Sequence, residues 1–493
     1  MSQKEFRYSG NPITKHSFES KLKVDVSVDK LFDWHNNPGA YERLTPPFDP
    51  VAVKYRRGNI DGGEVHIKLP PIAGVIPVPT WVAKHHSYKK NLQFMEDQSK
   101  GPFVGVLPFW NGSWQHQHLF KKLDKNSSLL TDKIYYDFPM DPFGSFLGGA
   151  YTKNRLKQMF AYRKNVTMND LYAQSKYTGK PLEIAVTGGS GLIGSELIPY
   201  LTTAGHKVQK IVRCRPKKGE LTWNIDEGTI SNLEGKDAIV HLAGEPINKP
   251  LGGKIPLPWT KWKRKEILES RVNSTRLLSE RLASLKKRPK VLVCASAIGY
   301  YGDNGDEMLS EDAENGTDYF SKVVREWEEA AKPAIDAGIR VVFLRLAPVM
   351  SPLGGALQVL SLPAMIGSSP PVAGGKQWWS WVGIDDAVGS VYHAIITDAL
   401  SGPVNVASPN PVRQKKWASV LANVFWGKLG FLTTLLPVPG IILKTFLGEF
   451  GNVLALSSIR VDSTKLIDSG YKFRFEELED CFRHVLGRRK LEN

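Results

Sequence analysis

Residues 183–201, EIAVTGGSGLIGSELIPYL, combine a short apolar run, a glycine loop and a helical segment in that order. Its glycines, Gly188, Gly191 and Gly194, are spaced as G-x-x-G-x-x-G. Gly188 permits the tight turn after the strand, Gly191 lets a pyrophosphate approach the backbone, and Gly194 lets the helix pack closely on the sheet. The helix N-terminus offers free N–H groups and a positive dipole end to the phosphates. We therefore predict a dinucleotide-binding unit with cofactor contacts from Gly188, Ser190, Gly191, Leu192, Ile193 and Gly194.

The end of the next predicted strand, KVQKIVR at residues 207–213, bears on the choice of cofactor. An NAD enzyme usually places Asp or Glu near this point to hold the ribose 2′-hydroxyl, whereas an arginine meets a 2′-phosphate. The strand ends at Arg213, nineteen positions after Gly194, with Arg215 close by. We therefore predict NADP rather than NAD as the cofactor, and the alternative is that Arg213 is a solvated surface residue.

The rest of the C-terminal region continues the alternation of strands and helices. Short apolar runs, DAIVHLAG (237–244), KVLVCAS (290–296) and IRVVFLRL (339–346), are separated by helical segments. This order predicts an α/β domain with a doubly wound parallel sheet, which we place at residues 182–487.

Residues 1–175 have a different pattern. Alternating runs such as SFESKLKVDVSV (17–28) and SLLTDKIYYDF (128–138) predict antiparallel strands, and residues 150–174 predict a long helix. One helix packed across a curved sheet makes an α+β domain, with a cavity between them for an apolar ligand. The polar segment QSKYTGKP (174–181) is the expected linker.

Composition narrows the partners and the compartment. The net charge of +16 is spread over short basic runs, which favours a solvated basic surface over a nucleic-acid partner. Three scattered cysteines match no metal spacing, and the N-terminus has no signal-peptide pattern, so we expect a reducing, cytoplasmic location. Within the segment 429–448 the apolar run falls short of the ~20 residues that a spanning helix needs, and Pro437 and Pro439 sit in its middle, so we expect no stable membrane insertion.

Several motifs carry a resemblance to a known family. TGGSGLIG (187–194), DAIVHLAG (237–244) and SAIGYYGD (296–303) resemble extended short-chain dehydrogenase/reductases of the NAD-dependent epimerase/dehydratase type. Segments typical of the YfcH-like subgroup of epimerase family proteins are similar to WTKWKRKEILESRVNSTRLL (259–278), GGKQWWSWVGIDDAV (374–388), GPVNVASPNPV (402–412) and LLPVPGIILKTFLGE (435–449). This resemblance, from about residue 182 to 486, implies a Rossmann fold with a small substrate lobe.

The resemblance also suggests site residues. Leu242 and Ala243 would line the nicotinamide side of the cofactor. Trp378 and Trp381 would come from the substrate lobe, although ordinary core packing is an equally open reading of both. Arg271 stands where many relatives carry an asparagine, and it would bind an anionic substrate if it faced the pocket.

The proton donor is less clearly marked. In this superfamily a tyrosine donates the proton, assisted by a lysine four residues on and by a Ser or Thr. Tyr319 has Lys322 only three residues on, which favours a surface lysine over a working pair. Ala297 falls at the usual serine position, so the catalytic candidates are Tyr319, Ser296 and Tyr300. The subgroup often has histidine at the position of Gly383, a further departure.

The N-terminal region resembles a second family. LFDWHNNPGAYERLTPPF (31–48) and QMFAYRKNVTMNDL (158–171) look like the helix-grip domain of the SRPBCC (START-like, polyketide-cyclase-like) superfamily, which implies a hydrophobic ligand. His116 and His118 share one face of a predicted strand. No third ligand with suitable spacing stands out, so we predict no metal site.

We therefore expect an NADP(H)-dependent oxidoreductase or epimerase-like enzyme that acts on an apolar or amphipathic small molecule. The alternative is a non-catalytic NADP(H)-binding sensor or scaffold coupled to a lipid-like ligand-binding domain. The pattern leaves the oligomeric state open.

Overall fold

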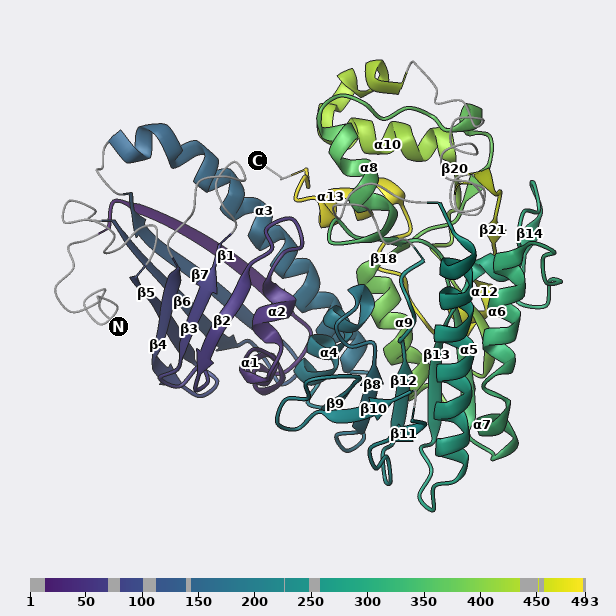
Figure 1. The fold of residues 1–493 in the computed structure, drawn as a ribbon. Coiled ribbons are helices and arrows are strands. Elements are labelled where there is room, and N and C mark those ends of the chain that lie inside the picture. Colours follow the sequence, from purple (N-terminus) through teal and green to yellow (C-terminus); the bar gives the residue numbers. More distant parts are fainter. Residues whose placement is uncertain are drawn as a thin grey trace. The chain divides into compact units, whose positions relative to one another are not determined.

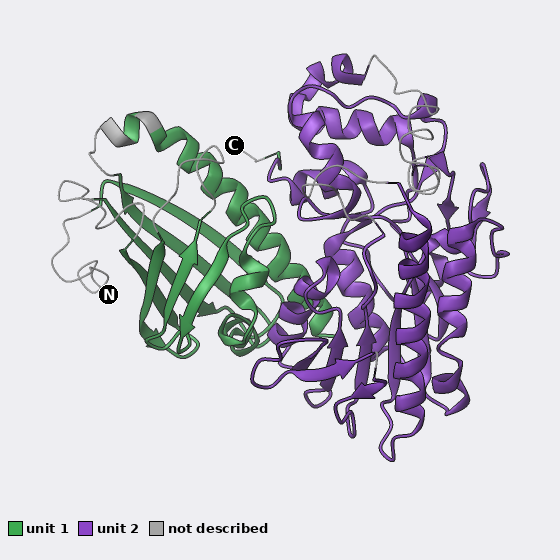
Figure 2. Ribbon diagram, in the orientation of Figure 1, with its two compact units in different colours: residues 1–178, 489–493 green, residues 179–488 purple. Residues whose placement is uncertain are grey.

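The computed structural model describes residues 14–69, 80–100, 112–138, 143–225, 227–247, 258–434, 451 and 456–490, apart from the side chains at 143, 144 and 147. The chain divides into two compact units (Figure 2). Unit 1 comprises residues 1–178 and 489–493, and unit 2 comprises residues 179–488.

Unit 1 contains a seven-stranded antiparallel sheet, with the strand order β1-β7-β6-β5-β4-β3-β2 (Figure 1). Its strands are β1 (His16–Val24), β2 (Ala52–Arg57), β3 (Glu64–Lys68), β4 (Trp81–Lys89), β5 (Gln93–Lys100), β6 (Ser113–Lys122) and β7 (Ser128–Asp137). Alternate side chains of β1 are buried more deeply than their neighbours, as the period of a half-buried strand requires.

Three helices complete unit 1: α1 (Val28–Asn36), α2 (Ala40–Leu44) and α3 (Phe143–Gln174). The hydroxyl of Ser27 caps α1 by accepting a hydrogen bond from the Lys30 amide. The helices share a buried apolar core with the sheet, in which Leu31 and Phe32 of α1 and Val166 of α3 contribute. An antiparallel sheet followed by one long helix is the arrangement that the alternating pattern predicts.

Unit 2 is built on an eight-stranded sheet with the order β11-β10-β9-β8-β12-β13-β15-β19, in which every pairing is parallel except that of β10 with β11. Its strands are β8 (Glu183–Thr187), β9 (Lys207–Val212), β10 (Leu221–Asn224), β11 (Thr229–Ile230), β12 (Ala238–His241), β13 (Val291–Ala297), β15 (Arg340–Leu346) and β19 (Gly402–Val406). The strand order reverses between β8 and β12. This confirms the predicted doubly wound α/β fold, in which ligands bind at the carboxyl ends of the strands beside the reversal.

Helices cover both faces of this sheet (Figure 1). The helices α4 (Leu192–Thr203) and α9 (Ile384–Ile396) pack together, and α5 (Lys261–Ala283) packs with α6 (Tyr319–Glu329) and α7 (Lys332–Asp336). Buried apolar side chains of β12, β13 and β15 join those of α5 and α7 in one core. The runs of apolar residues in the central strands follow from this burial on both faces.

Short elements extend the carboxyl edge of the sheet. They are η2 (Ile298–Tyr300), β14 (Met308–Leu309), β16 (Val349–Met350), α8 (Gly355–Met365), η3 (Ala373–Gly375), β17 (Trp378–Trp379), β18 (Val382–Gly383), β20 (Val412–Arg413), α10 (Gln414–Trp426), η4 (Gly427–Thr434), β21 (Arg460–Val461), α12 (Thr464–Asp468) and α13 (Leu478–Val485). Three two-stranded pairs form among them: β14 with β21, β16 with β18, and β17 with β20.

Two further expectations concern the membrane and the cysteines. Within the described part of the chain, no helix combines the length and the apolar character needed to cross a membrane. Most of the apolar segment at 429–448, from residue 435 on, lies outside the described residues. All three cysteines are free, with Cys214 exposed and Cys294 and Cys481 buried.

Candidate functional site

The glycine loop follows β8 at the reversal of strand order. Gly188 has φ +67°, a conformation that favours glycine, and a Cβ there would lie 2.6 Å from the carbonyl carbon of Leu242. A Cβ on Gly194 would lie 2.3 Å from the carbonyl oxygen of Gly188. Both positions therefore require glycine for close backbone approach: Gly188 against the end of β12, and Gly194 against the loop itself.

The N-terminus of α4 faces outward from this loop. Gly191 is its N-cap, and no side chain caps the helix there. Ser190 and Gly191 are exposed, while Leu192 and Ile193 are half-buried. The first N–H groups of α4 are thus free of a side-chain cap, as an anion-binding helix terminus requires.

Leu242 and Ala243, the predicted nicotinamide neighbours, follow β12 directly. Their amides both donate to the hydroxyl of Thr187, each at 3.2 Å. These hydrogen bonds tie the strand that enters the glycine loop to the neighbouring strand across the reversal. The structure therefore brings the two predicted cofactor segments together at one edge.

Arg213 lies one residue beyond the end of β9, and its side chain is exposed. Ile211 of β9 pairs with Thr187 of β8, so Arg213 emerges at the same edge as the glycine loop. This is where the second strand of a Rossmann unit meets the adenosine ribose.

Arg271 is buried beside the segment that follows β12. Its Nη1 donates to the carbonyl oxygens of Glu245 and Ile267, at 3.0 and 3.1 Å. Burial lowers its pKa to about 10, and Glu245 opposes this shift. The guanidinium therefore uses one of its nitrogens to hold the backbone next to the cofactor segment.

Tyr319 and Lys322 point to different partners. The Tyr319 hydroxyl donates to the carbonyl oxygen of Arg264 at 2.7 Å. Lys322 is 62% exposed and lies 3.7 Å from Glu326, one turn further along α6. The lysine thus occupies the outer face of the helix, as its spacing predicts.

Ser296 belongs to a buried ion-pair network. Its hydroxyl donates to Glu328 at 2.6 Å, and Arg345 binds both carboxylate oxygens of Glu328 at 2.9 and 3.0 Å. Only 3% of Ser296 is exposed. The serine and the arginine face each other across β13 and β15, so this hydroxyl is part of the sheet's internal structure.

Two tyrosines follow in η2 and directly after it. The Tyr301 hydroxyl donates to Asn405 at 2.7 Å, and burial raises its pKa to about 12. The ring of Tyr300 lies 3.5 Å from the guanidinium carbon of Arg345. Among the residues that the structure describes, none forms a hydrogen bond with the Tyr300 hydroxyl.

The two tryptophans differ in environment. Trp381 is fully buried, and its Nε1 donates to the carbonyl oxygen of Asn410, which agrees with the core-packing reading of this residue. Trp378 is half-buried between the guanidinium groups of Arg413 and Arg460, at 4.2 and 4.3 Å from its ring centroid. Gly383 is closely surrounded, since a Cβ would lie 3.2 Å from Phe475.

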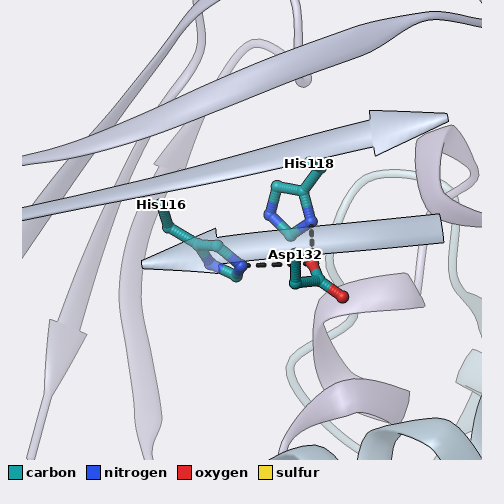
Figure 3. A group of neighbouring side chains, drawn as sticks. All are labelled: His116, His118 and Asp132. Carbon is teal, nitrogen blue, oxygen red and sulfur yellow. Dashed lines mark hydrogen bonds and ion pairs between the residues drawn. The ribbon is translucent and has the colours of Figure 1, made fainter. Parts of the chain in front are cut away.

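A second group of reactive side chains lies inside unit 1 (Figure 3). His116 and His118 of β6 meet Asp132 of β7, whose Oδ1 is 3.2 Å from His116 Nε2 and 2.7 Å from His118 Nδ1. Burial lowers the pKa of His118 to about 4 and also lowers that of His116. Burial alone would raise the pKa of Asp132, but the two histidines hold it well below its usual range.

Sequence spacing missed Asp132 as the third member of this group. The available signal was the hairpin: counting outward from the turn at residues 123–127 pairs His118 with Asp132. The expectation that no third ligand stands near the two histidines is therefore wrong.

The doubly wound sheet and the glycine loop at its reversal define a Rossmann-type dinucleotide-binding protein. The sequence profile of the NAD dependent epimerase/dehydratase family matches residues 184–407, and that of a domain of unknown function, DUF1731, matches residues 438–485. The epimerase family protein YfhF of Bacillus subtilis is 32% identical over 321 residues, which cover 63% of this chain and 99% of that protein. The human epimerase family protein SDR39U1 is 30% identical over 306 residues, covering 62% of this chain and 100% of that protein. The chain belongs to the NAD-dependent epimerase/dehydratase family.

Solved structures extend this likeness. The crystal structure of the nucleoside-diphosphate sugar epimerase from Corynebacterium glutamicum aligns with a TM-score of 0.75 at 30% identity, over 96% of this chain and 91% of that one. At this coverage the alignment includes unit 1. Human SDR39U1 isoform 2, solved with NADPH, aligns with a TM-score of 0.55 at 29% identity, over 62% of this chain and 98% of that one. The family profiles themselves match residues of unit 2.

Proposed function

We propose that this protein is an NADP(H)-dependent oxidoreductase or epimerase that acts on an apolar or amphipathic small molecule. The observation that carries the proposal is the glycine loop after β8, at the reversal of strand order, with Arg213 exposed at the end of the adjacent strand. An arginine at this point suits the 2′-phosphate of NADP. The human relative solved with NADPH supports the same choice.

Titration of the purified protein with NADPH and NADH tests the cofactor. We expect NADPH to bind more tightly, and Arg213→Asp to reverse the order, because a carboxylate repels the 2′-phosphate and accepts from a 2′-hydroxyl. Lys218→Asp makes the same charge change at an exposed position of the following segment. Equal binding of the two cofactors, or an equal effect of both substitutions, would contradict the role of Arg213.

The same proposal assigns the proton donor to Tyr300. Ser296 donates to Glu328 and Tyr319 donates to a backbone carbonyl, so either hydroxyl would have to break an internal hydrogen bond to serve the reaction. The Tyr300 hydroxyl has no such bond within the described residues. It follows directly on β13 in η2, at the carboxyl edge where ligands bind in this fold.

A second candidate function is that of an NADP(H)-binding sensor or scaffold without turnover. The hydroxyls of Tyr319 and Ser296 both donate to internal acceptors, and Lys322 pairs with Glu326. These contacts favour the second function, because they occupy groups that a catalytic role would need. Stereospecifically deuterated NADPH, incubated with the protein and a panel of aldehydes and ketones, separates the two functions. Deuterium in a product supports the oxidoreductase, whereas tight NADPH binding without transfer to any member counts against the oxidoreductase and favours the sensor over it.

For unit 1 we propose a helix-grip domain of the SRPBCC type that binds a hydrophobic ligand. The antiparallel sheet and the 32-residue helix α3 support this. A cavity of about 20 Å³ lies between them, enough for about one water molecule, so an apolar ligand must displace its walls. Native mass spectrometry of the full chain tests this, since a co-purifying lipid-sized mass is expected.

The free cysteines support a reducing, cytoplasmic location.

A further inference from the structure

The interior of unit 1 holds three metal-ligating side chains at one point. One ring nitrogen of His116, one ring nitrogen of His118 and a carboxylate oxygen of Asp132 all lie within 4.8 Å of one another. His116 and His118 are two residues apart on β6, so both point to the same face of the sheet. Asp132 lies directly opposite His118 on β7. Figure 3 shows the three side chains converging from the two strands.

The separations suit a small divalent cation. Zinc bonds of about 2.0–2.1 Å in a tetrahedral site place neighbouring ligand atoms about 3.3 Å apart. The two nitrogen–oxygen separations here are 2.7 and 3.2 Å. Both nitrogen–oxygen separations are therefore within about 0.6 Å of the tetrahedral value, a difference that side-chain rotation can close.

Hydrogen bonding alone leaves this cluster incomplete. His116 makes a hydrogen bond to Asp132, but His118 Nδ1, although 2.7 Å from the same oxygen, has no aligned hydrogen-bond partner. The His118 side chain is 9% exposed. The contact with Asp132 is close but poorly aligned for a hydrogen bond, and a cation between the two atoms would give this nitrogen a well-directed partner.

The space beside the cluster fits the same ion. The cavity of about 20 Å³ is lined by both His118 and Asp132, and one water molecule fits it as a fourth ligand. Glu96 of β5 lies opposite His116, so two carboxylates lie near the cluster, and Arg163 and Lys164 stand in the cavity wall. The carboxylates and the cationic side chains balance in number, so the three ligand atoms, rather than the net charge, favour a cation.

We propose that His116, His118 and Asp132 bind one zinc ion inside unit 1, with water in the open position. Two imidazoles and a carboxylate with one open position form a common protein zinc site. The binding does not depend on the cofactor site of unit 2, because all three ligands belong to unit 1.

Zinc binding by the full-length protein tests the proposal. After chelation and dialysis, titration with Zn²⁺ against a competing chromophoric chelator is expected to give one tight site per chain. Cobalt in its place should give the intense visible absorption of a tetrahedral site. His118→Gln and Asp132→Asn should each weaken binding by more than the roughly 10–100-fold that loss of an outer-shell partner causes.

The matched control is His86→Gln. His86 Nε2 lies 3.0 Å from Asp97 on the neighbouring strand, an imidazole–carboxylate pair that is 37% exposed at the histidine. This variant should keep the tight site. No stoichiometric zinc on the unaltered protein, or equal loss in the control, would overturn the proposal. Circular dichroism checks that each variant folds. If both ligand variants fail to fold, the deciding measurement is the Tm of the unaltered protein and of His86→Gln with and without zinc. A zinc-dependent rise in both supports the site, and no rise counts against it.

Discussion

The hydroxyl oxygen of Thr187 lies 2.7 Å from Nδ1 of His241, and this contact joins the ends of β8 and β12. The same hydroxyl accepts from the amides of Leu242 and Ala243, so its own proton goes to the imidazole. Nδ1 of His241 is therefore an acceptor, and its Nε2–H is left to donate to Thr275, 3.1 Å away. The cofactor segment after β12 thus depends on a neutral His241 in one tautomer.

We predict that acid destabilises unit 2 through His241. Burial lowers its pKa to about 4, against about 6.5 in the unfolded chain. Between these pH values the unfolded chain carries a proton on this histidine that the folded chain lacks. The contribution of His241 to the free energy of unfolding is therefore fully present above about pH 6.5 and is lost as the pH falls from there through about 4. The loss from this group is on the order of 3 kcal/mol. Denaturant unfolding over that pH range measures it, and His241→Gln should flatten the dependence.

His206 provides the control for this pH effect. Burial lowers its pKa to about 4 as well, but its nitrogens contact Leu182 and Tyr392 rather than the cofactor segment. His206→Gln should therefore flatten the pH dependence of stability and leave NADPH affinity unchanged. If both substitutions affect NADPH affinity equally, the link between His241 and the cofactor segment is refuted.

We predict that Gly194→Ala disables the cofactor loop. The added Cβ would lie 2.3 Å from the carbonyl oxygen of Gly188, so the loop or the helix must move. We expect NADPH affinity to fall at least about tenfold and stability to fall by about 1–3 kcal/mol. Gly149→Ala, in helix α3 with no atom within 4 Å of the added Cβ, should instead stabilise by about 0.5–1 kcal/mol. Fluorescence titration and denaturant unfolding measure both, and full NADPH affinity in the Gly194 variant would contradict the expectation.

We predict that Tyr300→Phe and Tyr319→Phe separate the two tyrosines. If Tyr300 donates the proton, its loss should slow deuterium transfer from labelled NADPH by about 10²–10⁴-fold at unchanged NADPH affinity. Tyr319→Phe removes the hydrogen bond to the carbonyl oxygen of Arg264, so it should cost about 1 kcal/mol of stability and little transfer. The opposite ranking in single-turnover measurements would return the role to Tyr319.

We predict that the ion pair between Arg43 and Asp170 is essential to unit 1. Arg43 binds both carboxylate oxygens, at 2.9 and 3.0 Å, and the two side chains are 1% and 0% exposed. Asp170→Ala leaves a buried guanidinium without its counter-charge and should cost about 3–5 kcal/mol. The exposed pair of Arg56 with Glu42 is the comparison, since Glu42→Ala should cost less than about 1 kcal/mol. Similar unfolding free energies for the two variants would contradict this reasoning.

Local signals account for what the sequence could predict. The loop from Gly188 to Gly194 lies between a strand and a helix that adjoin it in the chain, so its role follows from neighbouring residues. The parallel sheet follows in the same way, because each apolar run alternates with a helix. The position of Arg213 needed only the distance from the loop to the end of the next strand.

Contacts between distant residues account for what could not be predicted. The partner of Ser296 is Glu328 on α6, and nothing near either residue in the sequence pairs them. Trp381 and Trp378 share one motif, yet the first is fully buried and the second lies between two arginines. Burial of this kind depends on tertiary packing, which spacing along one segment does not contain.

The pairing of His118 with Asp132 also has a consequence for folding. Side chains alternate between the two faces of a strand, so a slip of one residue between β6 and β7 would turn the carboxylate away from the imidazoles. The misaligned hairpin would then bury charge without a partner or expose apolar side chains, and either costs free energy. The polar cluster therefore helps to specify the register of the β6–β7 hairpin, because it favours the native pairing over pairings shifted by one residue.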